Sequence, residues 1–134
     1  MREYNLFIIQ KDYYNLYNNH SYLLFDILKQ LDNTTSNFNY AINLFEQLCC
    51  QINIDMLAYY LNSKFNFNNI KEFYIKDVYI RLNYSRIIIK SKYNLPQIMK
   101  MFNCYNRYLF VCDFKNNDYF WLTDFVRIKA LAYN

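Results

Sequence analysis

Hydrophobic positions in the first third of the chain change from a continuous run to a helical spacing. Residues 4–9 form a short apolar run, which is typical of a buried β-strand. From Ser21, apolar residues recur at intervals of three and four, which predicts an amphipathic helix that Ser21 could cap. The apolar positions of this helix are Leu24, Ile27, Leu28 and Leu31.

Two further helices are predicted before the middle of the chain, after a polar break at residues 32–36. The first carries one apolar face, and the second covers residues 55–64. The apolar face of the first comprises Phe38, Ala41, Ile42, Phe45, Cys49 and Ile52, and the second carries Met56, Tyr59 and Tyr60.

The second half of the chain is richer in residues that favour strands. Residues 73–82 and 86–90 predict a hairpin that turns at residues 83–85, and residues 108–114 and 118–126 predict another. Between them Asn94 caps a predicted helix with Pro96 in its first turn and Gln97 placed for a capping box. The apolar stripe of this helix is Ile98, Met101, Phe102 and Tyr105.

The order of predicted elements is β-α-α-α-β-β-α-β-β, in which the later strands come as hairpins. We therefore expect an α+β fold in which helices cover a mostly antiparallel sheet of about five strands. A chain of 134 residues is long enough for one core, and we expect residues 1–134 to form a single domain.

The composition excludes several classes of enzyme. The chain contains no glycine and one proline, so phosphate loops, dinucleotide-binding fingerprints and nucleophile elbows are ruled out. Turns that need a positive φ must use asparagine or aspartate, and the turn at residues 115–117 has two asparagines for this purpose.

Candidate chemistry is sparse. His20 is the only histidine, and Cys49 and Cys50 are adjacent, which does not fit the spacing of a zinc site. Cys104 and Cys112 lie in apolar runs and fit core packing better than nucleophilic catalysis. We therefore expect no metal, no cofactor and no enzymatic activity. The chain also lacks a secretory signal and a membrane-length apolar stretch, so we expect a cytoplasmic protein.

Binding of single-stranded nucleic acid is the alternative function. The net charge is +4, and basic residues with tyrosines between them accumulate in the second half. The excess is modest and no ribonucleoprotein-type motif is present, so a solvated face is the favoured interpretation. The basic residues concerned are Lys90, Lys92, Lys100, Arg107, Lys115, Arg127 and Lys129.

A patch of tyrosines and asparagines lies between Lys11 and His20. If a helical turn begins at Asp12, Tyr13 and Tyr17 share one face, and asparagines surround them. Amphipathic tyrosines with a polar rim are typical of protein–protein hot spots. The same rings could instead cover the edge of the core, and the residues alone leave the two interpretations equal.

Two segments resemble the sporulation inhibitor of replication family (SirA), small bacterial proteins that block chromosome replication. Residues 4–28 resemble the family's first strand, its aromatic-x-Asn-x-Tyr motif and the helix that follows. Residues 107–122 resemble its aromatic-Leu-x-x-Asp-Phe strand, polar turn and Tyr-x-Trp-Leu strand. The matching positions are Tyr13, Asn15, Tyr17, Phe25, Asp26 and Ile27 in the first segment, and Leu109, Asp113, Phe114, Tyr119, Trp121 and Leu122 in the second.

This resemblance implies a partner and a site. Members of the family bind the N-terminal domain of the replication initiator DnaA, and two aromatic residues of their first helix are central to the contact. Those residues align with Tyr13 and Tyr17, and Leu16, Asn18 and His20 are their expected neighbours. The resemblance thus implies a DNA-replication inhibitor associated with sporulation, and we expect the protein to be a monomer.

Overall fold

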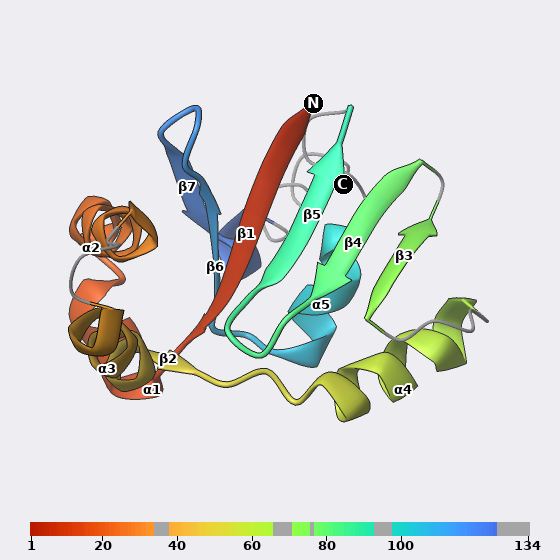
Figure 1. Cartoon of the computed structure of the whole chain (residues 1–134), viewed down its shortest axis with the longest axis horizontal. Coiled ribbons are helices and arrows are strands. Elements are labelled where there is room, and N and C mark those ends of the chain that lie inside the picture. Colours follow the sequence, from red (N-terminus) through yellow and green to blue (C-terminus); the bar gives the residue numbers. More distant parts are fainter. Residues whose placement is uncertain (34–37, 66–70, 76, 93–97, 126–134) are drawn as a thin grey trace.

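The first strand of the chain lies at the centre of the sheet. In a computed structural model that describes residues 1–33, 38–65, 71–75, 77–92 and 98–125, β1 (Arg2–Ile9) pairs with β5 on one side and β6 on the other (Figure 1). The sheet has seven strands in the order β3-β4-β5-β1-β6-β7, and β2 pairs with the end of β1. The other strands are β2 (Cys49–Cys50), β3 (Glu72–Ile75), β4 (Val78–Leu82), β5 (Ile87–Ser91), β6 (Leu109–Asp113) and β7 (Asp118–Trp121).

All pairings between these strands are antiparallel, which confirms the expected α+β class. Two groups of helices pack on opposite faces. On one face α1 (Lys11–Tyr17), α2 (Ser21–Asn33) and α3 (Phe38–Leu48) lie toward β6 and β7. On the other face α4 (Ile54–Phe65) and α5 (Met99–Tyr105) complete a larger core with side chains of β1, β4, β5 and β6.

Both faces of β1 are buried, which explains its continuous apolar run. Tyr4, Leu6 and Ile8 face the core of α4 and α5, whereas Phe7 and Ile9 face the core of α1, α2 and α3. Alternate side chains of a strand point to opposite faces, so a strand buried on both is mostly apolar, and the buried polar residue Asn5 accepts a hydrogen bond from Arg86 (3.2 Å). The central position of β1 therefore follows from its composition.

Several element boundaries differ from those predicted. Residues 73–82 form two strands, because Asp77 adopts a left-handed conformation (φ 67°) and reverses the chain between β3 and β4. The helix expected to reach Ile52 ends at Leu48, because Cys49 and Cys50 pair with β1 instead. The last predicted strand ends at Trp121, and residues 122–125 are helical.

The turn chemistry agrees with the prediction for a chain without glycine. In the described part of the chain, the residues with positive φ are Asp77 and Asn117, the latter at φ 51° in the turn between β6 and β7. Short polar side chains tolerate this conformation better than others. The predicted cap at Asn94, with Pro96 and Gln97, lies outside the described residues.

No helix among the described residues is long and apolar enough to cross a membrane. The longest described helix is α2, with 13 residues, whereas a span of the hydrocarbon core needs about 20.

Candidate protein-interaction surface on the first two helices

The orientation of α1 is fixed by a backbone hydrogen bond at its start and by the ring contacts of Tyr14. The backbone N–H of Gln10 donates to the Leu48 carbonyl (3.0 Å), which ties the start of α1 to the end of α3. The Tyr14 ring lies 5.0 Å from the ring of Tyr108 and 4.8 Å, edge to face, from that of Trp121. Tyr13 and Tyr17 pack against the same core as Tyr14, whereas Asn15 and Leu16 on the other side of α1 are exposed.

Tyr13 and Tyr17 form a stacked pair at the partly buried margin of α1. Their ring centroids are 6.5 Å apart and the planes differ by 14°. Both rings are half-buried, because they pack at the margin of the core under α1, α2 and α3 and leave their remaining surface in water. The pair thus combines the two interpretations of the tyrosine patch: it covers the edge of the core, and it is also accessible from outside.

The other predicted site residues lie next to this pair. Leu16, one turn from Tyr13, is 60% exposed, which is high for a leucine. Asn18 and His20 are exposed in the short connection to α2, where the Asn18 N–H donates to the Tyr14 carbonyl (2.9 Å) and that of His20 to the Tyr17 carbonyl (2.9 Å). The five predicted residues are therefore adjacent along α1 and the turn that follows it.

Two exposed apolar residues of α2 were not predicted as part of the site. Tyr22 is 54% exposed and Leu23 is 42% exposed, and the ring centroids of His20 and Tyr22 are 6.4 Å apart in an edge-to-face arrangement. A signal was present in the sequence, because both residues fall outside the apolar stripe that α2 buries through Leu24 and Leu28.

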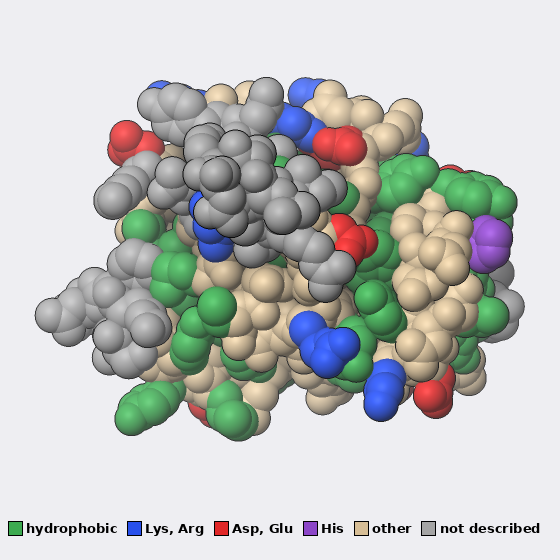
Figure 2. Space-filling view, turned by 180° about the vertical axis from the view of Figure 1, so that it is seen from behind, with side chains coloured by type: hydrophobic (Ala, Val, Ile, Leu, Met, Phe, Trp, Pro, Cys, Tyr) green, Lys and Arg blue, Asp and Glu red, His purple; other side chains and the backbone are tan. Residues whose placement is uncertain are grey.

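We define the α1–α2 surface as this group of accessible apolar side chains with the histidine between them. Figure 2 shows hydrophobic side chains on the part of the molecule where the histidine lies. Exposed asparagines at positions 15, 18 and 19 border the group. The members of the α1–α2 surface are Tyr13, Leu16, Tyr17, His20, Tyr22 and Leu23.

The hairpin of β6 and β7 supports this surface from behind. The Trp121 indole N–H donates to the Ser21 hydroxyl (3.0 Å), and Phe25 stacks on Tyr119 with centroids 4.8 Å apart. Rings from α1, α2 and the hairpin therefore form a continuous aromatic layer beneath the exposed residues.

A buried carboxylate holds the hairpin together. Asp113 accepts hydrogen bonds from the Asn116 side chain (2.8 Å), the Asn116 backbone N–H (3.2 Å) and the Arg2 guanidinium (2.9 Å). Burial alone would raise the pKa of Asp113, but the hydrogen bonds from Asn116 and Arg2 outweigh it and hold the pKa below its ordinary value. Arg2 also pairs with Asp118 (2.9 Å), so one cation joins the ends of β6 and β7 to β1.

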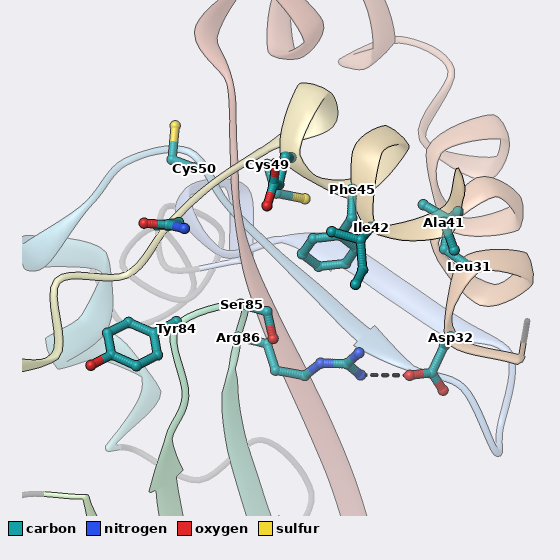
Figure 3. A pocket seen from close by; sticks show the side chains of 12 residues that line it. Leu31, Asp32, Ala41, Ile42, Phe45, Cys49, Cys50, Tyr84, Ser85 and Arg86 are labelled. Carbon is teal, nitrogen blue, oxygen red and sulfur yellow. Dashed lines mark hydrogen bonds and ion pairs between the residues drawn. The ribbon is translucent and has the colours of Figure 1, made fainter. Parts of the chain in front are cut away.

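A separate pocket of about 360 Å³ opens between α2, α3 and the turn from β4 to β5 (Figure 3). Its wall is mainly apolar, with Leu31, Ile42 and Phe45 from the helices. The Arg86 guanidinium at its edge donates to Asp32 (2.7 Å) and to Asn5 (3.2 Å). Because this cation is already engaged by the protein, the pocket is less suited than the α1–α2 surface to recognise a partner.

Cys49 and Cys112 are buried, whereas Cys104 is exposed, so the expectation that Cys104 packs in the core is wrong. Burial raises the pKa of the Cys49 and Cys112 thiols, so both stay protonated at neutral pH. No group of three metal-ligating side chains occurs among the residues that the structure describes.

The basic residues considered for nucleic-acid binding lie on separate elements. Lys90 is on β5, directly opposite Glu3 of β1, and its ammonium lies 5.5 Å from the Tyr79 ring. Lys100 is on α5, and Lys115 is in the turn between β6 and β7. Arg127 and Lys129 lie outside the described residues. Lys90 and Lys115 nevertheless line one pocket together with Arg2 and Arg86, so the structure brings together two of the residues on which the alternative function depends.

Comparison with protein-family models and with curated proteins finds no match to this chain. The resemblance to SirA thus consists of the two quoted segments alone. In the structure those segments lie against each other, since Tyr14 contacts Trp121 and Phe25 contacts Tyr119. Residues that carry the resemblance therefore build the α1–α2 surface and its support.

Proposed function

We propose that this protein is a non-enzymatic inhibitor of chromosomal replication initiation that binds the N-terminal domain of DnaA through the α1–α2 surface. The observation that carries the proposal is the stacked, half-buried pair of Tyr13 and Tyr17 beside the exposed Leu16. The resemblance to SirA supplies the identity of the partner.

The physical basis is a set of rings that are already ordered before the partner arrives. Each ring of the pair packs on the other and on the core margin, so little rotamer freedom is lost when a partner covers them. The exposed asparagines at the border can keep their hydrogen bonds with water or exchange them for bonds to the partner. An apolar centre with a polar border is the usual arrangement of a hot spot.

Inhibition by this route requires occupancy of the partner and no chemical step. The bound fraction of DnaA depends on the concentration of the inhibitor relative to the dissociation constant. We therefore expect inhibition to be stoichiometric, and to be reversed by an excess of the free N-terminal domain.

Calorimetric titration of the full chain with the purified N-terminal domain of DnaA tests the proposal. We expect the wild type to bind and the double variant Tyr13→Ala/Tyr17→Ala to lose about 1–4 kcal/mol of binding free energy for each ring. The half-buried position of the rings predicts that the variant stays folded, which circular dichroism can verify.

A matched variant, Tyr74→Ala/Tyr79→Ala, removes an equal number of phenol rings from another part of the surface and should bind like the wild type. Equal binding by the wild type and the Tyr13/Tyr17 variant would refute the assigned site. A parallel titration with single-stranded oligonucleotide at two salt concentrations addresses the alternative, which predicts binding that weakens steeply with salt.

A further inference from the structure

On the basis of the function proposed above, we infer that Trp121 is a positioning residue that fixes the angle between α1 and α2. By doing so it holds the two parts of the α1–α2 surface in one arrangement. The residue itself is only 4% exposed, so it acts through its neighbours and does not touch the partner.

One side chain contacts both helices. The indole N–H of Trp121 donates to the hydroxyl of Ser21, the first residue of α2 (3.0 Å). The same indole meets the Tyr14 ring of α1 edge to face, at 4.8 Å and 81°. On its third side it packs on Phe110 of β6 at 4.7 Å, which anchors it to the sheet. Trp121 therefore forms a fixed point between the two helices.

The connection between the helices does not by itself determine their angle. It consists of residues 18–20, and its backbone bonds are local: His20 N–H to Tyr17, and Leu23 N–H to His20 (3.0 Å). Such bonds close a turn but leave the direction of each helix to side-chain packing. With seven residues, α1 is also too short to be stable without tertiary contacts.

The α1–α2 surface is divided between the two helices that this connection joins. Tyr13 and Tyr17 belong to α1, whereas Tyr22 and Leu23 belong to the first turn of α2. A partner that covers both parts requires one angle between the helices. If only a fraction of molecules has this angle, the apparent dissociation constant rises in inverse proportion to that fraction.

Two substitutions remove the contact from opposite ends. Trp121→Phe keeps a ring against Tyr14 but loses the N–H, and Ser21→Ala removes only the acceptor. Each should weaken binding of the DnaA N-terminal domain about three- to tenfold, mainly through faster dissociation. Because both remove the same hydrogen bond, the double variant should be no weaker than the weaker single variant. Ser21→Thr keeps the hydroxyl and should restore binding.

A spectroscopic measurement on the free protein can detect a change in the angle between α1 and α2. Trp121 is the only tryptophan of the chain, so the full protein labelled with 5-fluorotryptophan gives a single ¹⁹F resonance. In the wild type we expect one narrow line. In Ser21→Ala the line should shift and broaden or split, because the indole loses its acceptor and the helices sample more than one angle.

Loss of stability alone is controlled by a substitution in the opposite core. Phe102→Leu alters a fully buried ring of α5 and should lower the melting temperature without changing affinity at a temperature where the protein is folded. If Phe102→Leu weakens binding as much as Trp121→Phe at equal loss of stability, the positioning role is overturned.

The outcomes separate this inference from the proposed function. Wild-type affinity in both Trp121→Phe and Ser21→Ala, with binding lost in Tyr13→Ala/Tyr17→Ala, overturns the positioning role and leaves the function intact. Absence of binding by the wild type overturns the function. In that case an unchanged ¹⁹F line in Ser21→Ala still overturns the positioning role, and an altered line supports it.

Discussion

Two pairs of neighbouring tyrosines lie on the accessible surface, and they differ in what surrounds them. Tyr13 and Tyr17 stack along a helix at 6.5 Å, with planes nearly parallel. Tyr74 and Tyr79 face each other across β3 and β4 at 5.3 Å, with planes 60° apart. By number of rings and accessibility alone, either pair could be chosen as a docking site.

Charged groups accompany the second pair. The Tyr79 hydroxyl donates to the Glu72 carboxylate (2.5 Å), and the Lys90 ammonium lies over the Tyr79 ring. In the strand register Arg81 is opposite Glu72, and Lys90 is opposite Glu3. Figure 1 shows no described helix in front of β3, β4 and β5, so this part of the sheet stays open to water.

The comparison shows that exposure of aromatic rings does not identify a binding site. A partner that covers Tyr74 and Tyr79 must also remove water from several charges, which costs free energy unless each is paired again. A partner that covers Tyr13 and Tyr17 removes water mainly from apolar side chains and asparagines, and the charged residues of α1 beside the pair are Lys11 and Asp12. We therefore expect the first pair to be the more favourable site.

The largest effect is expected when a charge is placed at the centre of the first site. Leu16→Asp would bury an unpaired carboxylate under the partner, which should cost about 3 kcal/mol, or roughly 100-fold in affinity. Tyr74→Asp, at a position that is 74% exposed, should change affinity by no more than about twofold. Calorimetry with both variants measures the contrast, and comparable losses would remove the distinction between the two pairs.

A smaller effect is expected from the carboxylate that holds the supporting hairpin. Asp113→Asn removes the ion pair with Arg2 and weakens the bonds from Asn116, which should lower the free energy of unfolding by about 1–3 kcal/mol. The hairpin lies behind Tyr13 and Tyr17 and not behind Tyr74 and Tyr79. Affinity should therefore fall together with stability in this variant, as denaturant titration and calorimetry can show.

The same carboxylate predicts a pH dependence with a definite sign. The pKa of Asp113 is lower in the folded chain than in the unfolded one. The contribution of this carboxylate to the free energy of unfolding is therefore complete above the ordinary pKa range of aspartate, and it is lost as the pH falls through the pKa of Asp113 in the folded protein. The wild type should lose stability faster than Asp113→Asn in that acidic range. If the free energy of unfolding falls equally with pH in the two proteins, the stabilising role of the Asp113 carboxylate is contradicted.

The smallest effect concerns the second pair itself. The hydrogen bond to the Glu72 carboxylate, together with some burial, raises the pKa of Tyr79. Any stabilisation from this hydrogen bond is therefore present at neutral pH and is lost as the pH rises through the pKa of Tyr79 in the folded protein. Glu72→Gln should lower the pKa of Tyr79 toward that of a free tyrosine and leave partner affinity unchanged. An NMR titration of the ring signals, with Tyr79→Phe for assignment, measures the shift.

Local patterns were sufficient to predict part of this molecule. The apolar run of β1, the stripe of α2 and the asparagine at a positive φ in the last hairpin all follow from residue type and spacing. Other features depend on distant partners. Cys49 and Cys50 continue a helical pattern and yet form a strand, because the end of β1 offers hydrogen bonds at that point.

At the candidate site, too, the sequence predicts local spacing but not contacts with distant residues. Spacing predicts that Tyr13 and Tyr17 share a face of α1, and the structure places them together. All three tyrosines of α1 pack against the same core, and spacing does not say which rings Tyr14 contacts there. The orientation of Tyr14 depends on Trp121 and Tyr108, which are close only after the sheet has formed.

The central position of β1 also has a consequence for synthesis on the ribosome. Arg2 bonds a carboxylate 111 positions further along, and the neighbours of β1 on both sides belong to the second half of the chain. This strand therefore emerges before β5 and β6 and, apart from its pairing with the short β2, stays without these neighbours until they have been translated. Such long-range pairing slows folding and leaves an apolar strand open to aggregation, so yield should depend on chaperones and on a low growth temperature.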